Sequence, residues 1–263
     1  MASRTKQKEE ARARRLAEEQ ARIERARRQR RLRMLGGVVL GAVVLVAVAI
    51  AISSGGKSGG GLAKGSKASQ TTSAVQSLLS GIPQSGDRLG NPKAPVTLTY
   101  YGDLECPICQ DFTLNGGFPQ LVSNDVKAGK VQIVYRAFQT ATRDPTVFQT
   151  QQVAALAAGE QQRFWNFVEL FYRQQGAEGT NYVTESYLDS LAGQVPGLNI
   201  TKWKTDRRNA ALASQVLADG QTGTKLGVTG TPTLIFQGPQ GTTTPSTAVS
   251  SYSELEQAVK KVA

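Results

Sequence analysis

The sequence predicts an α/β fold for residues 81–263, and three observations support that prediction. Two apolar runs rich in β-branched residues, 96–101 and 131–138, have the composition and length of buried strands. A third run of this kind, residues 233–236, lies near the C-terminal end. Between the second and third runs, residues 145–217 space their apolar side chains as helices do. The expected domain is therefore a strand-containing core with a helical insertion.

The N-terminal part of the chain predicts a membrane anchor. Residues 1–33 contain thirteen Lys and Arg against five Glu, and residues 34–52 are all apolar or glycine. A run of this length is near the lower limit for crossing about 30 Å of hydrocarbon. Since basic flanks stay in the cytoplasm, we expect a basic cytoplasmic tail (1–33) and a single transmembrane signal anchor (34–52). A cleaved secretory signal is the alternative, because Ala49-Ile50-Ala51 is similar to a cleavage site; the long basic segment favours the anchor.

The net charge of +11 does not indicate a nucleic-acid-binding protein. Residues 68–263 contain fifteen basic and fifteen acidic side chains, so the domain has no excess of positive charge to bind phosphate. The basic tail is expected to determine topology or to contact membrane lipid beside the anchor. Residues 53–80, rich in Gly, Ser and Lys, are expected to be a flexible linker that leads into one domain, 81–263.

The chain has only two cysteines, in the order Cys106-Pro107-Ile108-Cys109, and no histidine. This composition leaves no third thiol or imidazole for a structural zinc site or a separate structural disulfide, so no metal or cofactor is expected. Two thiols at this spacing, shortly after a strand, are what reversible dithiol–disulfide chemistry needs. Pro107 fits the first position of a helix that begins after Cys106, where its missing N–H costs nothing.

Proline and glycine set the other expected boundaries. Gly116, Gly117 and Pro119 are expected to interrupt the helix that follows the cysteines. Pro232 stands directly before the third strand, where it would remove a ladder donor, so we expect a cis Thr231–Pro232 bond. Further helices are expected at residues 146–174, 182–192, 203–217 and 252–262.

Four motifs occur in a fixed order: Gly90-Asn91-Pro92-Lys93-Ala94-Pro95-Val96, Cys106-Pro107-Ile108-Cys109, Gln161-Gln162-Arg163-Phe164-Trp165 and Gly230-Thr231-Pro232-Thr233. Over residues 87–263 this arrangement resembles the DsbA-like thiol:disulfide oxidoreductases of the thioredoxin superfamily. The resemblance implies a thioredoxin-like fold with an inserted helical domain. It also implies disulfide exchange with cysteines of exported proteins and reoxidation by a membrane quinone-linked partner. Two departures are the dipeptide Pro107-Ile108, where the best-known members have Pro-His, and Tyr100, where many relatives have a buried acidic residue.

The two cysteines are expected to have different roles. Cys106 at a helix N-terminus faces the positive end of the helix dipole, which favours its thiolate. Cys109, one turn further, is expected to be the buried resolving thiol. In the oxidising direction a substrate thiolate attacks the sulfur of Cys106 and Cys109 leaves. The resemblance places Thr231 and Pro232 opposite the cysteines, where the backbone of Thr231 would pair with substrate as a strand does.

Three polar residues near the cysteines in sequence are candidate proton relays: Tyr100, Asp103 and Glu105. For the two acids, the alternative is a pair of solvated carboxylates on a loop surface. Tyr100, with a reference pKa near 10, would donate or relay a proton at neutral pH but not accept one. The alternative for Tyr100 is a packed strand residue without a role in the chemistry.

Together these features predict a single-pass protein of the cell membrane, with its N-terminus in the cytoplasm and its catalytic domain outside. Its expected activity is the oxidation of cysteine pairs in exported proteins. A disulfide reductase or isomerase is the alternative within the enzyme class, because the sequence does not set the redox potential. A non-catalytic binding or chaperone module of the same fold is the other alternative, against which the intact CxxC argues.

Overall fold

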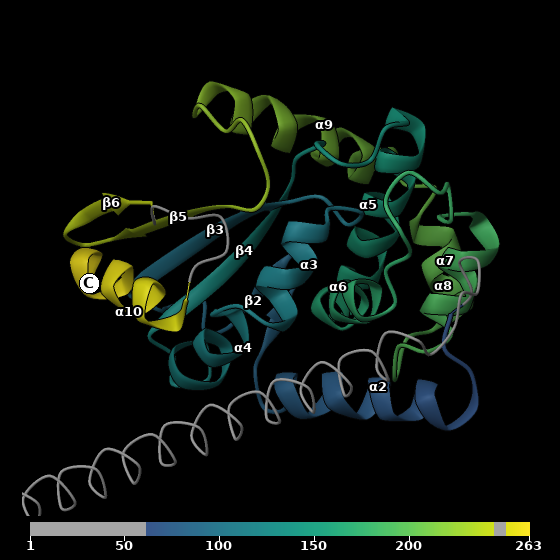
Figure 1. Ribbon diagram of the computed structural model, residues 1–263, viewed down its shortest axis with the longest axis horizontal. Coiled ribbons are helices and arrows are strands. Elements are labelled where there is room, and N and C mark those ends of the chain that lie inside the picture. The colour runs from purple at the N-terminus through teal and green to yellow at the C-terminus, as the bar shows by residue number, and fades with distance from the viewer. Residues whose placement is uncertain (1–61, 245–250) are drawn as a thin grey trace, which may run out of the picture. The chain divides into compact units, whose positions relative to one another are not determined.

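A single mixed sheet of six strands forms the centre of the fold (Figure 1). The computed structural model describes residues 62–244 and 251–263. The strand order is β1-β2-β4-β3-β5-β6. The tail and anchor expected at 1–33 and 34–52 lie outside the described residues. Within the described ranges, no helix is long and apolar enough to cross a membrane.

The three inner strands correspond to the three runs predicted from sequence, with ends that differ by one or two residues. β3 (Val96–Gly102) pairs in parallel with β4 (Val131–Ala137) and antiparallel with β5 (Thr233–Gly238). Because β3 has neighbours on both edges and helices over its faces, its side chains are buried or half-buried throughout. The outer strands are short: β1 (Gln84–Ser85), β2 (Arg88–Leu89) and β6 (Gly241–Thr243).

The helix that follows β3 is interrupted as expected. α3 (Pro107–Leu114) ends before the glycine pair, and α4 (Phe118–Leu121) begins after it and continues into a π-helical turn, η1 (Val122–Val126). A Cβ on Gly117 would lie 2.6 Å from the backbone nitrogen of Tyr252, so only glycine permits this approach to the C-terminal helix. That helix, α10, spans Tyr252–Val262, as predicted.

The helical insertion is longer and more broken than the sequence suggests. The single helical segment expected at 146–174 is two helices, because Gln162 adopts a φ of 59° and turns the chain between them. The segment expected at 203–217 is also two helices, and the second runs eight residues further, to Lys225. The inserted helices are α5 (Pro145–Gly159), α6 (Phe164–Arg173), α7 (Glu185–Ala192), α8 (Ile200–Asp206) and α9 (Ala210–Lys225).

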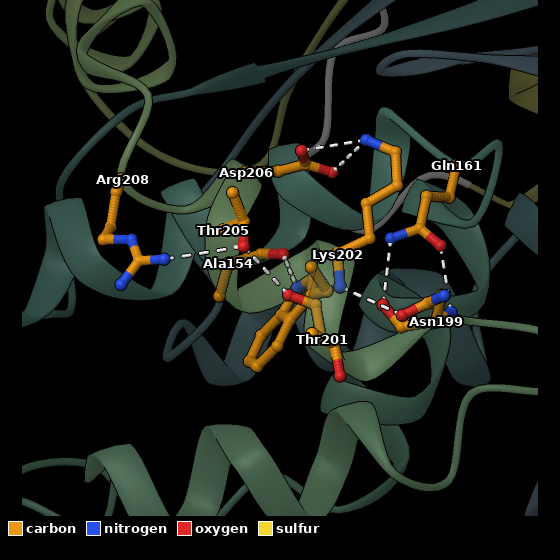
Figure 2. A network of polar contacts seen from close by, with 9 residues as sticks. Ala154, Gln161, Asn199, Thr201, Lys202, Thr205, Asp206 and Arg208 are labelled. Carbon is orange, nitrogen blue, oxygen red and sulfur yellow. Dashed lines mark hydrogen bonds and ion pairs between the residues drawn. The ribbon is translucent and has the colours of Figure 1, made fainter.

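Polar contacts hold α8 against the end of α5 (Figure 2). The side chain of Asn199 caps α8 by accepting the N–H of Lys202 at 3.0 Å. The amide of Gln161 bonds both backbone groups of Asn199, at 2.9 and 3.2 Å. The indole of Trp203 donates to the carbonyl of Ala154 at 2.8 Å. These bonds fix the outer layer of the insertion, while the aromatic face of α6 packs toward the cysteine-bearing helix α3.

The prediction of a flexible linker over residues 53–80 is wrong for residues 65–79. Residues Gly65–Leu79 form a helix, α2, that packs on α6. Val75 is fully buried and Leu79 nearly so, and the backbone N–H of Ala63 donates to Gln174 at 2.9 Å. Its two buried side chains lie one turn apart in a largely polar segment, which is too weak a periodicity to predict a helix, and their burial depends on α6, far along the chain. The folded domain therefore includes residues well before 81.

Candidate active site

The two cysteines occupy the first turn of α3, as the sequence predicts. Cys106 is the N-cap of this helix, with an extended backbone, and its sulfur accepts the N–H of Cys109 at 3.3 Å. Pro107 follows at the start of the helix, where no N–H is needed. Both cysteines are free thiols; Cys106 is 4% exposed and Cys109 is fully buried. Beside them Ile108 is 48% exposed, so the apolar surface at the site comes from the residue between the thiols.

The environment separates the acidities of the two thiols. Hydrogen bonds from the Cys109 thiol, from Thr231 and from backbone N–H groups outweigh burial and lower the pKa of Cys106 from 9.0 to about 6. Burial, together with the nearby Cys106, raises the pKa of Cys109 well above its usual range. At neutral pH the site therefore holds one thiolate, on Cys106, and one thiol, on Cys109.

The loop before β5 faces Cys106. The Thr231–Pro232 peptide bond is cis, as predicted from the position of the proline. In its protonated form the thiol of Cys106 donates to the carbonyl oxygen of Thr231 across 3.4 Å, and Thr231 is 8% exposed. The structure thus brings together Cys106, Thr231 and Pro232 from segments that are 125 residues apart.

Asp103 is fully buried, which contradicts its interpretation as a solvated loop carboxylate. One carboxylate oxygen accepts the backbone N–H groups of Thr140, Ala141 and Thr142, each at 2.9 Å. The other accepts the N–H of Glu105 at 3.1 Å and the hydroxyl of Thr142. The Asp103 carboxylate therefore joins the loop before the cysteines to the loop after β4.

Glu105 also lies inside the protein, at 7% exposure. Burial raises the pKa of its carboxyl above the usual range, and the nearby charge of Asp103 adds to the effect. A hydrogen bond with Thr142 opposes the shift. The surroundings of Glu105 thus favour the protonated form of its carboxyl, and Glu105 is a candidate proton relay.

Tyr100 lies beneath the first turns of α3 and is fully buried. Its hydroxyl is 3.2 Å from the hydroxyl of Thr113 and 3.5 Å from the phenol of Tyr172 and from the carbonyl oxygen of Cys109. Tyr172 in turn donates to the carbonyl of Asp103 at 3.2 Å. Burial, with a contribution from the neighbouring Cys109, raises the pKa of Tyr100 well above its usual range. Tyr100 therefore stays protonated at any physiological pH.

Residues of the insertion complete the site, and sequence reasoning did not find them. Tyr172 accepts a hydrogen bond from Gln110 on α3 at 2.6 Å through its backbone carbonyl. The side chain of Gln175 donates to the carbonyls of Leu104 and Cys106, at 2.7 and 3.2 Å. These residues lie about sixty to seventy positions from their partners, and no local pattern marks such contacts. Among residues 62–244 and 251–263, no group of three or more Cys, Asp or Glu side chains is arranged to hold a metal ion.

Known proteins are similar to this chain in sequence and in fold. Residues 84–261 match the family model described as thioredoxin. The chain is 27% identical over 157 residues to the probable disulfide bond formation protein D of Bacillus anthracis, an alignment that covers 57% of this chain and 69% of that protein. It is also 27% identical over 176 residues to disulfide bond formation protein D of Bacillus subtilis, covering 64% and 74%.

Solved structures show the same architecture. Oxidised BdbD from Bacillus subtilis matches with a TM-score of 0.58 at 23% identity, over 70% of this chain and 96% of that one. DsbA2 from Pseudomonas aeruginosa matches with a TM-score of 0.52 at 23% identity, over 68% and 95%. The first turn of α3 carries the thiolate and the thiol that disulfide exchange requires. The chain therefore belongs to the thioredoxin family and is a DsbA-like thiol:disulfide oxidoreductase.

Proposed function

We propose that this protein oxidises cysteine pairs of exported proteins while residues 34–52 tether it to the cell membrane. The observation that carries the direction is the separation of the two thiol acidities, with the pKa of Cys106 lowered to about 6 and that of Cys109 raised. A stabilised thiolate stabilises the reduced enzyme, and so makes its disulfide a stronger oxidant. The names of the relatives, disulfide bond formation proteins, support the same direction.

The reaction begins from the Cys106–Cys109 disulfide. A substrate thiolate attacks the sulfur of Cys106; a mixed disulfide forms, and Cys109 leaves as a thiolate that then takes up a proton, as its raised pKa requires. A second substrate thiolate attacks the substrate sulfur of this mixed disulfide. The substrate disulfide forms and Cys106 leaves as the stabilised thiolate. Two electrons have passed from substrate to enzyme, and a membrane quinone-linked partner is proposed to remove them.

The exposed surface around the thiols suits a protein substrate. Ile108 provides an apolar contact beside Cys106, and the backbone of Thr231 is proposed to pair with an extended substrate segment. The tether is supported by the basic segment 1–33 and the apolar segment 34–52. A reporter that is active only outside the cytoplasm, fused after Ala263, tests the topology; a fusion active only inside would overturn it.

Single-turnover oxidation of a reduced two-cysteine peptide by the full chain in detergent tests the activity. The oxidised wild type is expected to form the peptide disulfide, and Cys106→Ser to form none. Cys109→Ser is expected to accumulate a mixed disulfide that a reductant releases. Wild-type activity no higher than that of the double serine variant would favour a binding module. A glutathione-equilibrium potential near the −270 mV of thioredoxin would favour the reductase or isomerase alternative.

A further inference from the structure

Gln175 contacts the turn that leads into the cysteine-bearing helix. It follows Gln174, the C-cap of α6, and its side chain is half-buried. The side-chain nitrogen of Gln175 donates to the carbonyl oxygens of Leu104 and Cys106, at 2.7 and 3.2 Å. Only the NH2 group of a glutamine amide can donate to a carbonyl oxygen, so these two partners also determine which way the amide points.

One peptide unit of this turn is held on both sides. The turn is closed by its own hydrogen bond, from the N–H of Cys106 to the carbonyl of Asp103 at 3.1 Å. That bond uses neither polar group of the peptide between Leu104 and Glu105. The N–H of this peptide donates to the Asp103 carboxylate at 3.1 Å, and its carbonyl accepts from Gln175 at 2.7 Å. Because both polar groups are bonded, the peptide cannot rotate without breaking one of these bonds.

The conformation of the turn matters for the sulfur of Cys106. Cys106 caps α3 with an extended backbone (φ −73°, ψ 118°), and in this conformation its sulfur accepts the N–H of Cys109 at 3.3 Å. Since Gln175 binds the carbonyl of Cys106 as well as the turn before it, it holds the cap residue in the conformation that this bond requires. A negatively charged sulfur accepts an N–H more strongly than a thiol does, so the capped conformation stabilises the thiolate more.

We propose that Gln175 is a positioning residue for the Cys106 thiolate: its amide holds the turn 103–106 so that the sulfur stays at the N-terminus of α3. The inference rests on the proposed function only for the role of Cys106 as the attacked sulfur. Gln175 lies in the inserted helical region, so this region takes part in setting the acidity of a thiol on α3.

The test is the pH titration of the thiolate absorbance of the reduced full chain in detergent. The chain has only two cysteines, so the signal comes from the active site alone. Gln175→Met keeps the length of the side chain, removes its donors and changes no charge. If only about one half to one fifth of the molecules with a protonated thiol keep the capped turn, the titration midpoint rises by about 0.3–0.7 pH units. We expect a rise in this range.

Gln174→Met is the matched control. Gln174 is also half-buried, and its amide also makes two hydrogen bonds: it accepts the N–H of Ala63 at 2.9 Å and donates to Gln194 at 3.0 Å. Neither bond involves the turn 103–106. Both variants should lower the free energy of unfolding in urea by similar amounts, because each loses two bonds of the same kind. Only Gln175→Met should raise the midpoint; no rise, or an equal rise in both variants, overturns the proposal.

Hydrogen exchange of the Glu105 amide, followed by NMR of the full chain in detergent, also tests the wild type directly. This amide should exchange slowly, because its peptide must rotate away from Gln175 and Asp103 before water reaches it. In Gln175→Met it should exchange several times faster, and in Gln174→Met at the wild-type rate. Exchange in the wild type as fast as in an unfolded peptide overturns the proposal.

The proposed function and this inference can fail separately. A reducing wild-type potential would contradict the oxidase direction and leave the positioning of Cys106 as it is. The difference in midpoint between Gln175→Met and Gln174→Met tests the positioning alone.

Discussion

The phenolic oxygen of Tyr100 lies 3.5 Å from the carbonyl oxygen of Cys109, the residue that carries the buried thiol of the active site. Many DsbA-like relatives are expected to have a carboxylate at this position. A carboxylate with a raised pKa can accept the proton of the buried thiol when that thiol attacks a mixed disulfide. Tyr100 cannot, because burial moves its pKa further from neutrality.

Tyr100→Glu should therefore accelerate disulfide reduction more than dithiol oxidation. In reduction Cys109 must lose a proton before it attacks, and a base nearby is expected to increase that rate by about tenfold or more. In oxidation Cys109 leaves as a thiolate and takes up its proton afterwards. The measurement compares insulin reduction with oxidation of a reduced peptide for each variant.

Tyr100→Phe is the control for the loss of the hydroxyl, because it keeps the aromatic ring. It removes the bonds to Thr113 and Tyr172 without adding a base. Its two rates should change by similar factors. If Tyr100→Glu also changes both rates equally, Tyr100 is a packed strand residue and water or Glu105 provides the relay.

The reduced protein should gain stability through Cys106 as the pH rises from about 6 to 8. The pKa of Cys106 in the folded protein is about 6, below its ordinary value of 9.0. A depressed pKa adds stability that is complete above the unfolded value and is lost as the pH falls through the folded value. Linkage over this window gives about 2 kcal/mol, and solvent screening reduces it to roughly 1 kcal/mol. Urea unfolding of the reduced wild type and of Cys106→Ser, at several pH values, isolates this contribution; parallel pH profiles would contradict it.

Glu169 should have the opposite pH dependence. It is fully buried on α6, and burial raises its pKa to about 7 despite an ion pair with Arg173 at 3.3 Å. A raised carboxyl pKa means that stability is present at low pH and is lost as the pH rises from about 4.5 through 7, by about 3 kcal/mol. Glu169→Gln should remove that loss and flatten the profile in denaturant unfolding.

Glu256→Gln is the matched control for Glu169→Gln. Glu256 pairs with Lys260 at the same i,i+4 spacing, but both side chains are exposed. Exposed pairs of this kind contribute only a few tenths of a kcal/mol. Glu256→Gln should leave the pH profile of the unfolding free energy as it is in the wild type. If the wild type and Glu169→Gln have equally flat profiles, Glu169 does not titrate in this range.

Val75→Ala should lower the free energy of unfolding by about 2 kcal/mol, because it leaves a cavity between α2 and the domain. Gln76→Ala, on the exposed side of the same helix, should change it by less than about 0.5 kcal/mol. Denaturant unfolding of the full chain measures both. Equal, small effects would mean that α2 behaves as the flexible linker first expected.

The inner strands could be predicted closely because β3 and β4 are rich in Val, Ile, Leu and Tyr, the residues that favour buried strands. The break between α5 and α6 could not, since apolar spacing continues across the turn at Gln162. The helix α2 was missed for a related reason. Its sequence is polar at most positions, and packing on α6 rather than local periodicity stabilises it.

The chemistry of the site follows from local sequence features: two thiols three positions apart, Pro107 at a position that suits the start of a helix, and Pro232 directly before a strand. These features are local, and helix and strand geometry convert them directly into a site. The surroundings of the thiols depend on contacts between segments far apart in the chain. The tertiary structure buries Asp103, and it brings Tyr172 and Thr140 to partners that lie 69 and 91 residues away. The register of β3 on β4 and the packing of α6 bring these partners together. No local sequence pattern includes both members of either pair, so the contacts could not be predicted from the sequence.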